Sequence, residues 1–185
     1  RLIWMLDGYT TTDRYPYADP VRGMGNYIRN SVKVTVDAYD GVVTFYVADA
    51  TDPIVRTYAR GFPGLLKPLA QMPADLQRHI RYPEDFFAIQ ARKYAVYHME
   101  DPQVFYNKED LWAVPRRTVE GREREMEPYF TIMRLPGESR EEFILLTLFN
   151  PSRRDNMIAW LAARSDPPNY GRLLVYNFPK QKLVY

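Results

Sequence analysis

The two histidines are the first candidates for metal chemistry, because imidazole is a common ligand of transition metals. His79 and His98 lie far apart in the sequence and form neither an i, i+4 pair nor an HExxH motif. A zinc site would need the fold to bring them together with Glu84, Asp85 or Asp101. The simpler interpretation is that His98 packs on the apolar side of a helix and that His79 lies on a solvated face. Because the chain also has no cysteine, we expect no metal and no cofactor.

The serines and glycines offer little for nucleophilic catalysis or phosphate binding. The sequence has no Gly-x-Ser-x-Gly and no Ser-x-x-Lys motif. Four serines sit beside predicted turns or loops and are interpreted as caps: Ser31, Ser139, Ser152 and Ser165. Gly23 and Gly25 lack the third glycine and the strand-to-helix context of a phosphate-binding loop. We interpret both as loop hinges.

The acidic side chains leave one alternative open. Four aspartates cluster oxygen atoms of the kind that calcium prefers, although the twelve-residue calcium loop is missing and a hairpin turn explains them first: Asp37, Asp40, Asp49 and Asp52. Other acids stand near aromatic residues, as the paired carboxylates of a glycoside hydrolase would: Asp7, Asp13, Glu84, Asp85 and Asp110. Their separation in space decides that chemistry and is not given by sequence. The catalytic residues therefore remain unknown.

The charge of the chain is nearly balanced, with Lys+Arg 25 against Asp+Glu 23 and a formal net charge of +2. Such a charge is too small to attract nucleic acid over the whole surface, so we expect no nucleic-acid partner. The densest basic run lies within residues 116–125, where glutamates interleave with the arginines. We predict a solvated, mobile loop there.

The composition is that of a folded, water-soluble domain, with 185 residues of which 46% are hydrophobic and 26% charged. The longest stretch without Asp, Glu, Lys or Arg is residues 143–152, about half of the ~20 residues that a membrane-spanning helix needs. The chain opens on Arg1 without a basic and then apolar leader, which indicates a processed chain or an excised piece. Its 15 tyrosines favour half-buried strands over a sugar- or protein-binding surface.

A β-hairpin over residues 31–49 is the clearest predicted element. Apolar residues alternate with polar ones on both sides of Asp40-Gly41, a pair typical of a two-residue turn. This turn predicts that Val36 lies opposite Phe45 and that the valine face of the hairpin belongs to the core.

Proline-punctuated helices are predicted to follow. Asp52-Pro53 begins a short helix that ends at Gly61, a longer helix runs from Pro83 to about Met99, and Asp101-Pro102 begins another. Asn107 and Asp110 are then predicted to cap a turn that carries Leu111 and Trp112.

Strands are predicted again towards the end of the chain. Residues 129–135 and 142–149 form a second predicted hairpin, and residues 156–164 suit either a capped helix or a strand, of which we favour a strand paired with residues 172–178. A weak internal similarity at a spacing of thirty residues suggests a further strand pair within residues 3–19. Antiparallel hairpins packed against a central, proline-punctuated helical segment define an α+β fold.

Several motifs in this order resemble one family: WMLD from residue 4, NYIRNSVK from residue 26, RYPED from residue 81, YHM from residue 97 and NMIAWLAARSD from residue 156. The chain resembles uncharacterised protein family 0182, which consists of bacterial multi-pass membrane proteins of unknown function. The resemblance implies that residues 1–185 are a single domain on the extracytoplasmic side of the cell membrane. It also implies that this domain is a fragment of a longer membrane protein, tethered by the membrane-embedded remainder of the same polypeptide. It carries over no catalytic residue.

Two functions are consistent with these observations. The first is a non-catalytic binding or interaction module, with a protein or an envelope glycan as its partner. The second is an envelope-polymer hydrolase with paired carboxylates in an aromatic-lined cleft. We favour the first, because no motif provides an acid held by identifiable partners.

Overall fold

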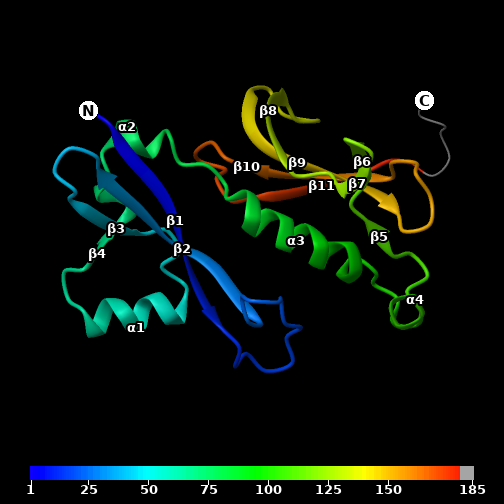
Figure 1. Ribbon diagram of the computed structural model, residues 1–185, viewed down its shortest axis with the longest axis horizontal. Helices are drawn as coiled ribbons and strands as arrows, with labels where there is room; N and C mark the ends of the chain where they lie inside the picture. Colours follow the sequence, from blue (N-terminus) through cyan, green and yellow to red (C-terminus); the bar gives the residue numbers. More distant parts are fainter. Residues whose placement is uncertain (180–185) are drawn as a thin grey trace. The chain divides into compact units, whose positions relative to one another are not determined.

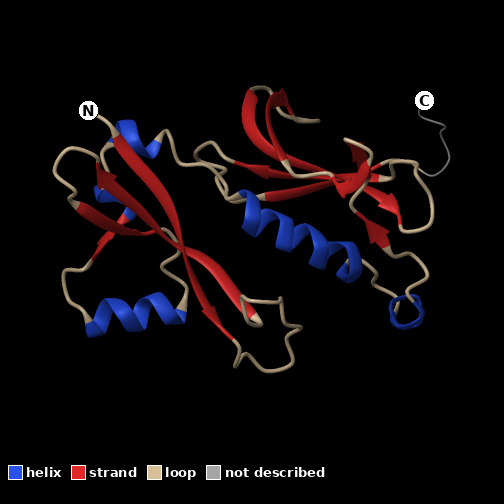
Figure 2. Cartoon of the chain, viewed as in Figure 1, coloured by secondary structure: helices blue, strands red, loops and turns tan. Residues whose placement is uncertain are grey.

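The computed structural model describes residues 1–179. The chain divides into two compact units, Arg1–Pro83 and Glu84–Tyr185, and each is considered by itself (Figure 1). Figure 2 shows helices and β-strands in both units, and most strand pairs are antiparallel. These features confirm the predicted α+β class. The expectation of a single domain stays a prediction.

The first unit contains a four-stranded sheet in the order β1-β2-β3-β4. Its strands are β1 (Ile3–Thr12), β2 (Tyr27–Asp37), β3 (Val43–Val47) and β4 (Leu66–Pro68). The first three strands are antiparallel neighbours, and β4 runs parallel to β3. The connection from β3 to β4 contains α1 (Pro53–Gly61), and η1 (Leu69–Gln71) and α2 (Ala74–Gln77) follow β4.

The β2–β3 hairpin forms at the predicted place but in a different register. Val36 pairs with Val43, whereas we predicted Phe45. A two-residue turn at Asp40-Gly41 would need a positive φ at both residues, but only Gly41 has one, at 72°. The loop between the strands is therefore longer, and the pairing shifts by two positions. A shift of two keeps Val36 and Phe45 on the same face of the sheet.

Residues 3–19 do not form the predicted strand pair. Residues 3–12 are one continuous strand, β1, which pairs with β2 from Ile3 opposite Asp37 to Thr12 opposite Tyr27. The internal similarity at thirty residues thus does not reflect a repeated hairpin. Strand β1 instead forms an antiparallel three-stranded meander with β2 and β3.

The second unit is built on a sheet in the order β11-β10-β9-β5, with β8 also paired to β9. Its strands are β5 (Trp112–Ala113), β8 (Tyr129–Arg134), β9 (Glu141–Pro151), β10 (Ala159–Arg164) and β11 (Leu173–Asn177). The long helix α3 (Glu84–Tyr97) contacts β5 and β9. The core of this unit includes Phe87 from α3 and Phe149 from β9, both fully buried. The predicted strands at residues 129–135, 142–149, 156–164 and 172–178 are confirmed.

The charged segment at residues 116–125 is not a loop. It forms a two-stranded hairpin of β6 (Arg116–Val119) and β7 (Arg122–Glu125). The turn residues Glu120 and Gly121 have φ values of 52° and 75°, as a tight hairpin turn requires. Most side chains of residues 116–125 are exposed, as predicted. Because both faces of these strands are charged, apolar periodicity could not identify them as strands.

The predictions for residues 101–112 are only partly correct. Helix α4 (Pro102–Asn107) begins at Asp101 as predicted, and it ends at Lys108, whose φ is 52°. Trp112 belongs to β5 and pairs with Pro151 of β9, so it does not lie in a capped turn. The pairing partner is distant in sequence, which local capping rules do not detect.

Candidate functional site

One face of the first unit's sheet carries three rows of apolar residues across β1, β2 and β3. Cross-strand neighbours line up in three rows: Trp4, Val36 and Val43; Leu6, Val34 and Phe45; and Gly8, Val32 and Val47. We call this surface the apolar sheet face. No charged side chain interrupts the rows, and the indole N–H of Trp4 is their one side-chain hydrogen-bonding group.

Much of the apolar sheet face is exposed. Trp4 is 62% exposed, Leu6 52% and Val43 47%, and Val34 and Phe45 at the centre are only half-buried. Large apolar side chains that stay exposed together on a folded unit mark a surface that contacts something else. This face is the strongest candidate for a functional surface in the described chain.

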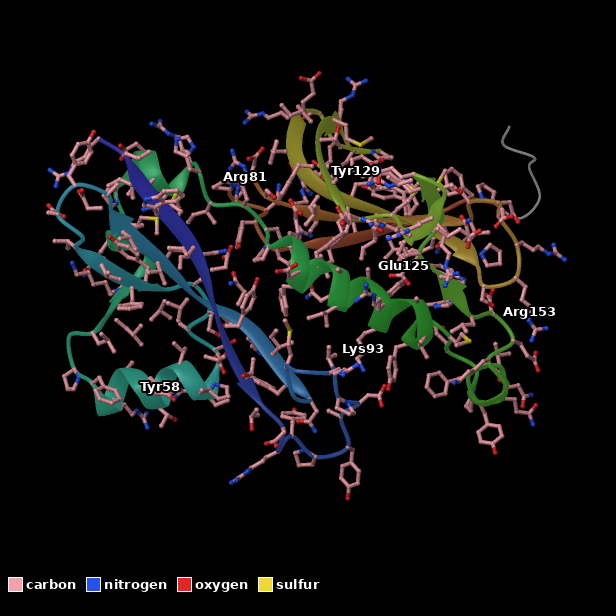
Figure 3. The ribbon with its side chains drawn as sticks, in the orientation of Figure 1. Tyr58, Arg81, Lys93, Glu125, Tyr129 and Arg153 are labelled. Atoms are coloured by element: carbon pink, nitrogen blue, oxygen red, sulfur yellow. The ribbon has the colours of Figure 1, made fainter. Side chains whose placement is uncertain are left out.

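The opposite face of the same sheet carries a buried polar row on β2, flanked by apolar neighbours such as Met5 of β1 and the buried Tyr46 of β3. Ser31, Lys33 and Thr35 of β2 are all below a tenth exposed. The segments that follow β3 cover this face, since Asp52 contacts Ser31 and the carbonyl of Arg81, labelled in Figure 3, accepts from Lys33 Nζ at 3.4 Å. The usual arrangement, with apolar residues inside and polar residues outside, is inverted along β2, although apolar side chains of the neighbouring strands lie beside its polar row. Our prediction that the valine face belongs to the core of this unit is therefore wrong.

The buried polar face is organised around Asp52. Its carboxylate accepts from Thr10 Oγ1 at 2.5 Å, from Ser31 Oγ at 2.6 Å and from Tyr27 Oη at 2.7 Å. It also accepts from the Ile54 amide at 3.0 Å and so caps α1. Burial by itself would raise the pKa of Asp52, but these hydrogen bonds outweigh it and lower the pKa to about 2. Asp52 is therefore a fully ionised structural anchor.

Lys33 is the second ionisable group on the buried face. Its side chain is 5% exposed and forms an ion pair with Asp7. Burial lowers the pKa of Lys33, and the neighbouring Asp7 carboxylate opposes that effect. Asn30 Nδ2 donates to the same Asp7 oxygen at 3.1 Å. This carboxylate thus serves as a structural counter-ion.

In the second unit, His98 lies in an aromatic cluster. Its ring stacks on Trp112 with 3.8 Å between the centroids, and Nδ1 lies 3.1 Å from the Tyr94 carbonyl oxygen. The side chain is 8% exposed, and Nε2 lies 3.9 Å from a carboxylate oxygen of Asp110. His98 is thus a packed residue, as predicted. Among residues 1–179, His98 Nε2 and Trp112 Nε1 are buried without a hydrogen-bond partner.

Arg164 forms the main buried ion cluster of the second unit. Its side chain is 3% exposed, and it forms ion pairs with Glu142 and with Glu138, the latter at 2.7 Å. The hydrogen bond from Arg164 lowers the pKa of Glu142 against the opposing effect of burial, and Asn169 Nδ2 donates to the same carboxylate at 3.3 Å. The cluster joins β9, β10 and the turn after β8.

The structure assigns the remaining candidates to separate places. His79 belongs to the first unit and is exposed, whereas His98 belongs to the second. Residues 1–179 contain no group of three or more His, Asp or Glu side chains placed to hold a metal ion. Nor does this part of the chain contain a helix long and apolar enough to cross a membrane.

The four aspartates considered for calcium are used in turns, pairs and caps. Asp37 and Asp40 both form ion pairs with Arg1, Asp49 pairs with Arg29 at 2.8 Å, and Asp52 is the anchor described above. Among the carboxylates considered for hydrolysis, three are assigned structural surroundings: Asp7 pairs with Lys33, Asp13 lies 3.9 Å from Arg14, and Asp110 lies near His98. Glu84 and Asp85 are exposed in the first turn of α3.

One of the four serines, Ser31, contradicts its prediction as a cap beside a turn or loop, whereas Ser165 lies beside a turn as predicted. Ser31 is fully buried within β2, and Ser165 is buried directly after β10. Ser139 and Ser152 do lie at bends or turns. Of the two glycines, Gly25 has a demonstrable requirement, because a Cβ at that position would lie 2.4 Å from the Thr12 carbonyl oxygen. A close approach of two backbone segments explains this glycine better than a hinge.

Sequence reasoning missed the apolar sheet face as an exposed surface. Residues 2–6 are all apolar and bounded by Arg1 and Asp7, a signal for a short strand but not for one with a single apolar face. The pattern could not indicate whether the apolar sheet face would be covered. In the structure, the segments that follow β3 cover the other side of the sheet.

Known proteins similar to this chain all share its family name. The chain is 60% identical over 185 residues to a UPF0182 protein of Pelotomaculum thermopropionicum. It is 57% identical to one of Desulforamulus reducens and 60% identical over 186 residues to one of Bradyrhizobium diazoefficiens. All of the chain is matched in each case, yet it spans only 20% of each relative. No solved structure matches the chain. Since the model of the uncharacterised protein family UPF0182 matches residues 1–185, the chain belongs to that family and forms part of a larger protein.

Proposed function

We propose that this region is a non-catalytic interaction module of an integral membrane protein, on the extracytoplasmic side of the cell membrane. The observation that carries the interaction role is the apolar sheet face, where three rows of apolar side chains are exposed on an ordered sheet. A face of this kind gains free energy when a partner removes it from water, at about 25 cal/mol per Å² of apolar surface.

The ionisable groups support binding over catalysis. The carboxyl groups with clearly shifted pKa values in residues 1–179 are Asp37, Asp49, Asp52 and Glu142, and all four pKa values are lowered. The general acid of a glycoside hydrolase needs a raised pKa, so that it holds a proton at working pH. These four carboxyl groups are therefore poorly suited to the role of that acid.

The interaction role can be tested with the 185-residue chain. We expect the chain to bind the dye ANS and to associate with itself at high concentration, because both processes use exposed apolar surface. Leu6→Glu should reduce both and leave the far-ultraviolet circular dichroism spectrum unchanged. Tyr106→Glu is the matched control, since Tyr106 is 87% exposed but lies on the short helix α4. A folded chain without dye binding, or an equal effect of the two variants, would contradict the proposal.

The extracytoplasmic placement is supported by the resemblance to a family of bacterial membrane proteins, and its test needs the full-length protein in cells. Trypsin applied to spheroplasts should cut at the exposed arginines of the β6–β7 hairpin around Gly121, because an isolated two-stranded hairpin opens easily. Arg122→Gln with Arg124→Gln should remove the cuts in β7 and leave those after Arg116 and Arg117 in β6. Protection of the hairpin until the inner membrane is breached would place the region in the cytoplasm.

A further inference from the structure

We infer that the occupant of the apolar sheet face is the remainder of the same polypeptide, which lays an apolar layer of its own across β1, β2 and β3. This inference rests on the proposed interaction role, and it names the partner.

The length of the polypeptide outside this region is the first argument. The chain spans 20% of its relatives from Pelotomaculum thermopropionicum and Bradyrhizobium diazoefficiens, so about four-fifths of each protein lies elsewhere in the same polypeptide. A segment joined to the sheet by its own backbone is present at an effective concentration of the order of millimolar. A free partner would have to bind far more tightly to displace it.

The chemistry of the face is the second argument. The central row, Leu6, Val34 and Phe45, has an apolar row on each side, so an occupant finds no charge and, apart from the indole N–H of Trp4, no hydrogen-bonding side chain to recognise. Such a face therefore recognises an occupant by its shape and its apolar area, as one layer of a domain core recognises the other. A partner that binds reversibly usually finds a more polar surface.

The shape of the third row also suits a packed layer. Gly8 has no side chain, and a Cβ there would lie 3.1 Å from Val32 Cβ. The close atoms belong to the paired strand β2, so the pairing itself explains this glycine, which leaves the third row shallower than the other two. Because residue 8 has no side chain, Val32 and Val47 are accessible from the side of the apolar sheet face.

Charges at one end of the face oppose insertion into lipid. Arg1 pairs with Asp37 and Asp40 beside the row that contains Trp4. Both signs occur together there, so anionic lipid would meet acidic as well as basic groups. A protein layer that leaves this end in water avoids the cost of burying these ions.

Photo-crosslinking in the full-length protein tests the inference directly. Trp4 is replaced by p-benzoylphenylalanine, an aromatic of similar size, and Leu6 is replaced in a second variant in case the first does not fold. Tyr17 is the control, because it is fully exposed in the loop after β1. After irradiation of cells, we expect the two face positions to give a product at the mass of one polypeptide, with the partner peptide mapped outside the 185 residues. The control should give at least five-fold less of this product.

The other outcomes separate the inference from the proposed function. A product with twice the mass, a product with a different protein or a product with lipid would overturn the inference about the occupant, while the interaction role would stand. If neither face position gives more product of any kind than Tyr17, the face is open to water and both conclusions fail.

Discussion

Replacement of Asp52 by asparagine tests whether the buried polar face is held together by an ionised carboxylate. The amide has the same shape and still caps α1, but it carries no charge and cannot accept every hydrogen bond from Thr10, Ser31 and Tyr27. The variant therefore isolates the contribution of the charge.

The magnitude follows from the pKa of Asp52, which is lowered from 3.8 to about 2. Such a shift corresponds to about 2 kcal/mol of unfolding free energy at neutral pH. Because the folded-state pKa is the lower one, this stability is present above pH 4 and is lost as the pH falls through 2. The difference between wild type and Asp52→Asn should therefore be about 2 kcal/mol at pH 6 and roughly half of that at pH 3.

Urea unfolding followed by far-ultraviolet circular dichroism at the two pH values measures this difference. Hydrogen exchange at pH 6 should show that β2 and α1 lose protection, which locates the effect in the first unit. Asp101→Asn is the matched control, because Asp101 also precedes a proline and caps a helix through the Gln103 amide at 2.8 Å, but it is exposed. We expect the control to cost about 0.5 kcal/mol or less, since asparagine caps nearly as well as aspartate. An equal cost at pH 6 and pH 3, or a control as severe as Asp52→Asn, would refute the reasoning.

Three further predictions concern other parts of the chain. Arg164→Met should lower the unfolding free energy of the second unit by about 3 kcal/mol in urea, because it leaves the largely buried Glu142 without its counter-ion. Arg116→Met is the control and should cost under about 0.5 kcal/mol, since Arg116 belongs to an exposed ion pair with an N–O distance of 3.6 Å. Burial and the Asp52 carboxylate raise the pKa of Tyr27 to about 12, so Tyr27→Phe should remove one late step from a spectrophotometric tyrosine titration and cost about 1 kcal/mol of unfolding free energy. EDTA should leave the melting temperature unchanged, and a drop of several degrees would reveal a metal that contributes to folding.

The Asp-Pro pairs show what local sequence can predict. Both Asp52-Pro53 and Asp101-Pro102 begin helices, since aspartate accepts from the first free amides and proline needs no amide partner at the first helical position. Yet one aspartate is buried in a network of three hydroxyl groups, and the other is exposed. Those hydroxyl groups come from β1 and β2, which no rule about neighbouring residues connects to position 52.

The two hairpins with charged or acidic turns show where pattern reasoning fails. At residues 37–43 the predicted place was correct, but hydrogen bonds from the Tyr39 and Val42 amides to aspartate side chains stabilise a longer loop and shift the register. At residues 116–125 the absence of an apolar face concealed a hairpin whose turn conformation depends on Glu120 and Gly121. Hydrophobic periodicity shows which face of a strand is apolar, so it gives no signal for a strand without an apolar face.

The sequence by itself determined the α+β class, the starts of α1, α3 and α4, most strands and the family, because caps, prolines and short-range periodicity act within a few residues. Only the tertiary structure decided which face of the first sheet is buried. The valine rows and the Ser31, Lys33 and Thr35 row alternate along the same strand, so each could have faced inward. The polar row of β2 is inside because the segments after β3 cover that side, where Tyr46 is also buried and where Asp52 and the Arg81 carbonyl satisfy the buried hydroxyl and ammonium groups. This long-range match leaves the apolar sheet face exposed.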